Sequence, residues 1–163
     1  MTATADRRLL AVEPFCGAGG MAEGLRLAGW DCAWAGDMDA RAVATFRGAL
    51  LPEAEEMRLT VEEASALAAR IVEEHGPIDL LAGGPPCQGF SLAGKGLGAD
   101  DPRDGFPAFL ALVGEVRPRA VLIENVKGLT SKKHVPYLEH VAAELERLGY
   151  AVPRCPERGW PGR

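Results

Sequence analysis

The chain has 163 residues, of which 47% are hydrophobic and 25% charged, and its formal net charge at pH 7 is −5. This size predicts a single domain with a sizeable core, and the composition is typical of a soluble globular protein. No apolar run reaches the roughly 18–20 residues that span a bilayer, and no secretory signal opens the chain. We therefore expect a cytoplasmic protein with reduced cysteines and no membrane contact. Its negative charge does not suit a protein that holds DNA phosphates by itself.

Apolar runs alternate with helical patterns along the chain, which predicts βα units. Short apolar segments favour strands at residues 9–12, 32–35, 78–82 and 120–123, and residues 150–152 are a candidate further strand. Helical periodicity lies between these segments, and a last helix is expected from about residue 135 to residue 148. The pattern predicts an α/β fold with a mostly parallel sheet. Residues 1–152 would form this domain, and residues 153–163 an irregular tail.

Several residues mark expected helix ends. Asp39 is placed to cap one helix, and Thr60 followed by Glu63 forms a capping box for the next. Gly29 and Gly149 follow helical patterns and are expected to end them, because glycine readily adopts the left-handed conformation found there.

A glycine-rich segment, residues 15–20, lies between the first predicted strand and the first predicted helix, where a cofactor-binding loop belongs. Gly17, Gly19 and Ala22 also fit the dinucleotide pattern G-x-G-x-x-G/A, and Asp37 follows the second strand, 20 residues past Gly17. An acid at that position can accept hydrogen bonds from the ribose hydroxyls of a dinucleotide or of another cofactor that contains ribose. A tight strand-to-helix turn without a ligand is the remaining alternative.

Cys87 lies just beyond the predicted strand at 78–82, after two glycines and two prolines. Because ligands and chemistry gather beyond the carboxyl ends of strands in open α/β sheets, this cysteine is a candidate nucleophile. The alternative is a small buried hydrophobic residue, which is the commonest role of an isolated cysteine.

Glu124 and Asn125 follow the apolar strand at 120–123 in the same way. If this strand lies beside the one that leads to Cys87, a thiol and a carboxyl group would act on one small substrate. If Glu124 were partly shielded from water, its pKa would be raised, which suits a general acid. A solvated strand end is the alternative. The three histidines have no partner at metal-ligand spacing, so no metal site is expected.

With these motifs in order, the chain resembles the DNA (cytosine-5) methyltransferases. Residues 15–20 match the family's F-x-G-x-G-G cofactor motif, residues 84–91 its Pro-Cys nucleophile motif, and residues 124–126 its E-N-V motif. The resemblance implies a Rossmann-like sheet that binds S-adenosylmethionine, with helices on both faces of that sheet. It also implies that the Cys87 thiolate attacks C6 of a flipped-out cytosine, that Glu124 protonates or holds N3, and that C5 is then methylated.

The remaining site assignments follow from the same resemblance. Asn125 and Val126 would brace the substrate pocket beside Cys87 and Glu124. The implied cofactor-binding residues are Phe15, Gly17, Gly19, Gly20, Asp37, Met38 and Pro86.

The chain departs from the family pattern in three places. Met38 stands where an aromatic residue usually stacks on adenine, and residues 58–60 where an acid usually meets the adenine amino group. After Gly149 the family's Q-x-R-x-R motif, target-recognition region and final segment are missing, so we expect the sheet to be incomplete at its C-terminal side. DNA would then be held through a missing or separate recognition chain, in restriction-modification or another role.

Other functions remain open from the sequence. The chain could be a truncated or inactive cofactor-binding or interaction domain. A tRNA cytosine-5 methyltransferase of the same family is a further alternative, and a nicotinamide oxidoreductase rests on the glycine pattern alone.

Overall fold

A five-stranded parallel sheet forms the centre of the protein in the computed structural model, which describes residues 8–86 and 104–153. The strands are β1 (Leu9–Pro14), β2 (Trp30–Asp37), β3 (Glu55–Glu56), β4 (Leu80–Gly83) and β5 (Ala120–Ile123). Their order in the sheet is β3-β2-β1-β4-β5. The chain therefore reverses its direction of winding between β1 and β4, as in Rossmann-like folds.

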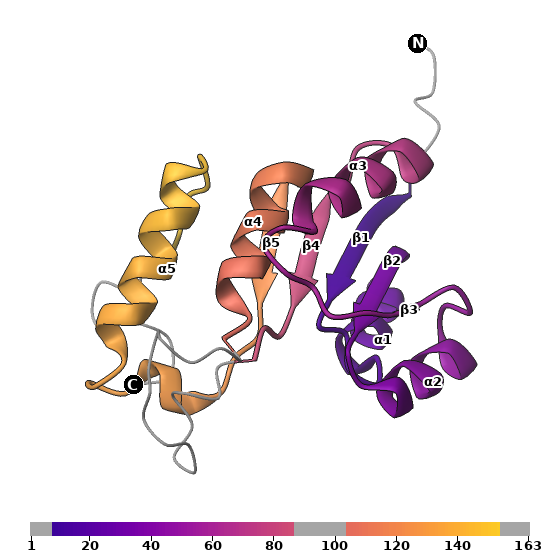
Figure 1. The fold of residues 1–163 in the computed structure, drawn as a ribbon, viewed down its shortest axis with the longest axis horizontal. Helices are drawn as coiled ribbons and strands as arrows, with labels where there is room; N and C mark the ends of the chain where they lie inside the picture. The colour runs from indigo at the N-terminus through magenta and orange to yellow at the C-terminus, as the bar shows by residue number, and fades with distance from the viewer. Residues whose placement is uncertain (1–7, 87–103, 154–163) are drawn as a thin grey trace.

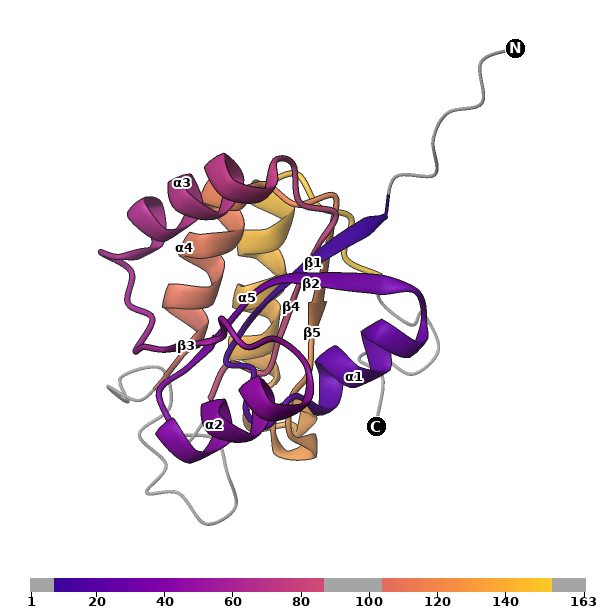
Figure 2. The ribbon, with the colours of Figure 1, turned by 90° about the vertical axis from the view of Figure 1, so that its right-hand side faces the viewer.

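Helices cover both faces of this sheet, as the family resemblance implies (Figures 1 and 2). They are α1 (Gly20–Leu27), α2 (Ala40–Ala49), α3 (Ala64–His75), α4 (Phe106–Val116) and α5 (Val135–Arg147), with a 3-10 turn at Lys127–Thr130. Adjacent residues of β2 separate the two layers: Ala35 packs with α1 and α2, whereas Trp34 joins the cluster formed by α3 and α4.

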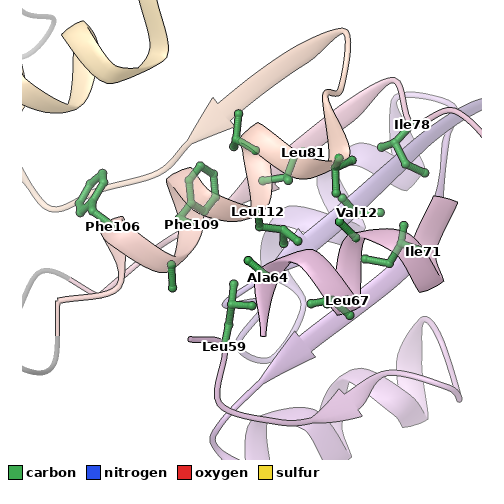
Figure 3. Packing of buried hydrophobic residues seen from close by; sticks show 14 of the residues in the cluster. Val12, Leu59, Ala64, Leu67, Ile71, Ile78, Leu81, Phe106, Phe109 and Leu112 are labelled. Carbon is green, nitrogen blue, oxygen red and sulfur yellow. The ribbon is translucent and has the colours of Figure 1, made fainter. Parts of the chain in front are cut away.

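The main hydrophobic core lies between the central strands and the α3–α4 layer (Figure 3). Val12 of β1, Leu81 of β4 and Phe109 of α4 are completely buried there. Both β1 and β4 have neighbours on each side in the sheet and carry apolar residues in succession, which is typical of strands buried on both faces.

β5 differs from the other long strands because it forms one edge of the sheet and pairs only with β4 among the described residues. Its residues alternate between exposed and half-buried, and Leu122 is 45% exposed. No helix in the described part of the chain is long and apolar enough to cross a membrane.

The helix ends agree with the sequence in three places. The Asp39 carboxylate accepts hydrogen bonds from two backbone N–H groups in the first turn of α2. Gly29 and Gly149 have φ angles of 87° and 96°, in the left-handed region where glycine is favoured. Thr60 Oγ1 accepts from the Glu63 N–H at 3.3 Å, but this pair lies in a turn before α3, which begins at Ala64.

Two strand predictions differ from the structure. The sequence does not predict β3, because Glu55 and Glu56 carry no apolar signal. These residues form a strand by pairing with Gly36 and Asp37. Residues 150–152 form no strand, since no neighbouring strand pairs with them in the described chain. Their predicted conformation is therefore wrong.

Candidate active site

The loops that carry the predicted motifs leave the carboxyl ends of β1 and β4, which are neighbours in the sheet. This is the topological switch point, where open α/β sheets bind their ligands. The glycine-rich loop follows β1, and the segment that leads to Cys87 follows β4. Cys87 itself lies outside the described residues.

The glycine-rich loop leaves backbone accessible at the start of α1. Gly17 and Gly19 have φ angles of 53° and 97°. A Cβ atom at Gly17 or Gly20 would meet nothing within 4 Å, whereas one at Gly19 would lie 2.6 Å from a methyl carbon of Leu50. The N-cap residue of α1 is Gly19, which makes no side-chain cap, so among the described residues the first N–H groups of this helix are suited to a ligand carboxylate.

Asp37 connects this loop to the end of β2. The Gly17 N–H donates to Asp37 Oδ2 at 2.9 Å, and the Asp39 N–H donates to Oδ1 at the same distance. Each carboxylate oxygen has more than one lone pair, so the group can still accept from a ligand hydroxyl. Asp37 therefore shapes the loop and keeps the capacity to bind ribose.

A cavity of about 340 Å³ lies beside the loop and brings together three predicted cofactor residues, Phe15, Met38 and Pro86. Phe15 has a φ angle of 58°, an uncommon value for a residue with a side chain, and it is held there at the end of β1. Met38 is 63% exposed and forms part of the rim. The other lining residues are Arg58, Leu59, Thr60, Val61, Asp104, Gly105, Pro107 and Ala108.

Glu124 lies against the start of the segment that leads to Cys87. A Cβ atom at Gly84 would be 3.1 Å from Glu124 Oε2, and the Glu124 N–H donates to the Gly83 carbonyl at 3.0 Å. The parallel pairing of β4 and β5 thus places an acid beside the backbone that carries the candidate nucleophile.

The surroundings of Glu124 differ from the expectation in two respects. Its side chain is exposed, so the shielding from water that would favour a general acid is not met in the described structure. Asn125 and Val126 do not line the cavity with Phe15. They line a separate cavity of about 830 Å³ between β5 and α5, where Asn125 Oδ1 accepts from the Val126 N–H at 2.8 Å.

Glu13 is a site feature that the sequence analysis missed. Its side chain is 2% exposed in β1, and its Oε2 atom has no hydrogen-bond partner among the described residues. Burial raises the pKa of this carboxyl group from 4.5 to about 7. An acidic residue inside an apolar strand, two residues before the glycine-rich loop begins at Phe15, was the available signal.

The two described cysteines are poor candidates for a nucleophile. Burial, followed by the negative charge of Asp37, raises the pKa of the Cys16 thiol to about 12. Burial, followed by the charge of Glu13, raises that of Cys32 to about 12 as well. Because the thiolate is the reactive form, both side chains are expected to be inert in the folded protein.

Comparison with known proteins shows which protein family this chain is similar to. The family model of the C-5 cytosine-specific DNA methylases matches residues 10–154. Type II methyltransferase M.NaeI of Lentzea aerocolonigenes is 41% identical over 88% of this chain and 34% of its own length. Type II methyltransferase M.AgeI of Thalassovita gelatinovora is 37% identical over 86% of this chain and 33% of its own length.

A solved structure agrees with these matches. A prophage-encoded E. coli protein assigned as a DNA modification methyltransferase superposes with a TM-score of 0.67 and 30% identity, over 85% of this chain and 38% of that one. The chain therefore spans about a third of the length of the curated relatives described above.

Proposed function

The chain belongs to the C-5 cytosine-specific DNA methylase family, and on that premise we propose that it is the catalytic portion of an enzyme that methylates C5 of cytosine in DNA. The methyl donor would be S-adenosylmethionine. The observation that supports this most directly is the closeness of the Glu124 carboxylate to Gly84, three residues before Cys87: a Cβ atom at Gly84 would lie 3.1 Å from Glu124 Oε2. The proposed acid is therefore near the described segment that leads to the proposed nucleophile.

The residues around the glycine-rich loop fit S-adenosylmethionine. The cavity of about 340 Å³ is within the usual range for small-ligand sites, and its apolar residues Phe15 and Met38 suit an adenine ring. Asp37 can accept hydrogen bonds from ribose hydroxyls, and the uncapped start of α1 suits the carboxylate of the amino-acid end. Gly17, Gly19 and Gly20 would let the ligand approach the backbone closely, and Pro86 would close the cavity.

When bound, this cofactor would supply the methyl group. The Cys87 sulfur would donate its electron pair to C6 of cytosine, which makes C5 nucleophilic. Glu124 would hold or give a proton at N3, so that the charge arriving on the ring is neutralised. After transfer, loss of the C5 proton would return electrons to the ring and expel the sulfur. The base must leave the helix for both ring faces to be reached. Asn125 and Val126 would brace the pocket.

DNA binding is proposed to need a further polypeptide region. The chain covers about a third of its relatives, and its net charge of −5 opposes phosphate contacts. Residues 1–152 would then be the cofactor-binding catalytic domain, and residues 153–163 a tail outside it. A target-recognition region on the same or another chain would supply contacts to bases and phosphates.

Methyl transfer from tritiated S-adenosylmethionine to a duplex with unpaired cytosines tests this function. The chain is assayed alone and mixed with the remaining two thirds of the Lentzea aerocolonigenes relative, supplied as a separate polypeptide. We expect incorporation that Cys87→Ser abolishes and Glu124→Gln reduces. Equal incorporation by Cys87→Ser, or none under either condition, would contradict the proposal.

A second candidate is a cofactor-binding domain without catalysis. The exposure of Glu124 and the placement of Asn125 and Val126 in a separate cavity favour it. Calorimetric titration with S-adenosylmethionine and with NAD separates the cofactor classes, because only the first should bind. Cofactor binding without methylation of DNA or tRNA in any mixture would favour this candidate over the enzyme.

A further inference from the structure

The beginning of α4 is held by a side chain from α5, far along the sequence. Asp104 precedes α4, and its Oδ1 atom accepts from the Phe106 N–H at 3.1 Å. Its other oxygen, Oδ2, accepts from the Tyr137 hydroxyl of α5. The Tyr137 ring also meets the Phe106 ring edge to face, with centroids 5.7 Å apart and an angle of 84°. One tyrosine thus contacts both residues that shape the first turn of α4.

Gly105 lies between Asp104 and Phe106 and packs tightly in the wall of the proposed cofactor cavity. Its N–H donates to the Pro86 carbonyl at 2.9 Å. A Cβ atom at Gly105 would lie 2.5 Å from Pro86 Cδ and 3.1 Å from Phe15 Cζ, so neither neighbour leaves room for a side chain. Pro86, Phe15 and Gly105 all line the cavity of about 340 Å³. A displacement of Gly105 is therefore expected to change its hydrogen bond with Pro86 and the packing of that wall.

We propose that Tyr137 is a positioning residue for the cofactor cavity and acts through Asp104 and Gly105. Its hydroxyl group fixes the Asp104 carboxylate, Asp104 fixes the first turn of α4, and Gly105 in that turn sets the separation of Pro86 from Phe15. Tyr137 does not line the cavity of about 340 Å³ itself. The inference depends on the proposed function only in taking this cavity as the S-adenosylmethionine site.

The chain offers a matched control for removing one tyrosine hydroxyl. Tyr150 follows α5, and its hydroxyl donates to the Pro118 carbonyl at 2.7 Å, away from the cavity residues. Tyr137→Phe and Tyr150→Phe each delete one partly buried hydroxyl group and keep the ring. A merely structural role for Tyr137 predicts similar effects of the two changes on every property.

Cofactor affinity distinguishes positioning from general stabilisation. By calorimetric titration with S-adenosylmethionine, we expect Tyr137→Phe to weaken binding about 3- to 10-fold, because part of the free energy of one lost hydrogen bond to a carboxylate is transmitted to the cavity. Tyr150→Phe should bind like the wild type although its thermal unfolding midpoint falls by a similar amount. Asp104→Ala should weaken binding at least as much as Tyr137→Phe.

Hydrogen exchange at the Gly105 amide tests the same linkage without any cofactor. This N–H is bonded to Pro86, so its exchange should become faster in Tyr137→Phe and remain unchanged in Tyr150→Phe. If the wild-type chain fails to bind S-adenosylmethionine, the proposed function fails while the exchange measurement still decides the role of Tyr137. Unchanged Gly105 exchange in Tyr137→Phe, or equal loss of affinity in both tyrosine variants, would overturn the proposal.

Discussion

The centre of the sheet and its β5 edge carry the two halves of the candidate site, and they are supported very differently. β1 and β4 are flanked by strands and covered by packed helices, and the loop after β1 is tied back to β2 by Asp37. β5 has one strand neighbour, half-exposed residues and an exposed Glu124. The comparison shows that neighbouring strands, packed helices and the Asp37 hydrogen bond support the proposed cofactor-binding half. In the described residues, the proposed acid follows a strand that has a neighbour on only one side.

Core truncation should give the largest contrast between the two regions. Phe109→Ala removes a completely buried ring from the cluster over β1 and β4, and should cost about 3–5 kcal/mol of unfolding free energy. Leu122→Ala at the edge should cost about 0.5 kcal/mol or less, because that side chain is 45% exposed. Urea unfolding measures both. Similar losses would mean that the edge is as tightly packed as the centre.

The buried Glu13 carboxyl group should make the stability of the central region depend on pH. Its pKa is about 7 in the folded protein and 4.5 ordinarily, so the folded state holds this proton more tightly than the unfolded chain. The resulting stability is complete below pH 4.5 and is lost as the pH rises through 7. At about 1.4 kcal/mol for each unit of pKa, the loss reaches about 3 kcal/mol.

Glu13→Gln should therefore gain stability relative to wild type as the pH rises from 4.5 to 8. Chemical unfolding of both proteins across this interval measures the difference, and groups that titrate in both proteins cancel from it. A constant difference over the interval would show that the folded and unfolded states bind the Glu13 proton equally.

Two adjacent glycines at the end of β4 allow a finer test. A Cβ at Gly83 would lie 2.3 Å from the Pro14 carbonyl oxygen, so Gly83→Ala must displace the backbone of β1 and should cost about 1–3 kcal/mol. Gly84→Ala meets the end of the Glu124 side chain at 3.1 Å, which can move. The thermal unfolding midpoint of this variant should stay close to that of the wild type. Methyl transfer should be lost, because the added methyl group displaces the carboxylate of the proposed acid. Equal destabilisation would place Glu124 in a rigid setting.

The smallest effect is expected in chemical labelling, where the thiols of Cys16 and Cys32 should hardly react in the folded protein. With a pKa of about 12, only about one Cys16 or Cys32 side chain in 10⁴ is a thiolate at pH 8. Iodoacetamide followed by peptide mass spectrometry should therefore modify both only after unfolding, and Cys87 already in the folded protein. Rapid labelling of Cys16 in the folded protein would show that the loop after β1 opens readily.

Sequence patterns predicted the central architecture well, because its elements depend on local signals. Buried strands correspond to apolar runs in the sequence. The Asp39 cap and the glycine that ends a helix, Gly29, depend only on residues a few positions away. β3 could not be found in this way, since Glu55 and Glu56 become a strand only through pairing with β2.

The candidate site was predictable only in part. The motifs indicated which loops meet at the switch point, and the structure brings Phe15, Met38 and Pro86 to one cavity. The exposure of Glu124 and the separate placement of Asn125 depend on what covers β5, and no local pattern reports that. Tyr137 gave no signal either, because its contact with Asp104 joins residues 33 positions apart.

The outer edge of β5, which pairs with no strand in the described part of the chain, also has a practical consequence for handling this protein. Its four residues, Ala120–Ile123, are all apolar, and unpaired backbone beside apolar side chains is the usual template by which one sheet recruits another. Purified material should therefore aggregate more readily as it is concentrated. A lysine in place of Leu122 should improve solubility, because charge on an outer strand discourages such stacking.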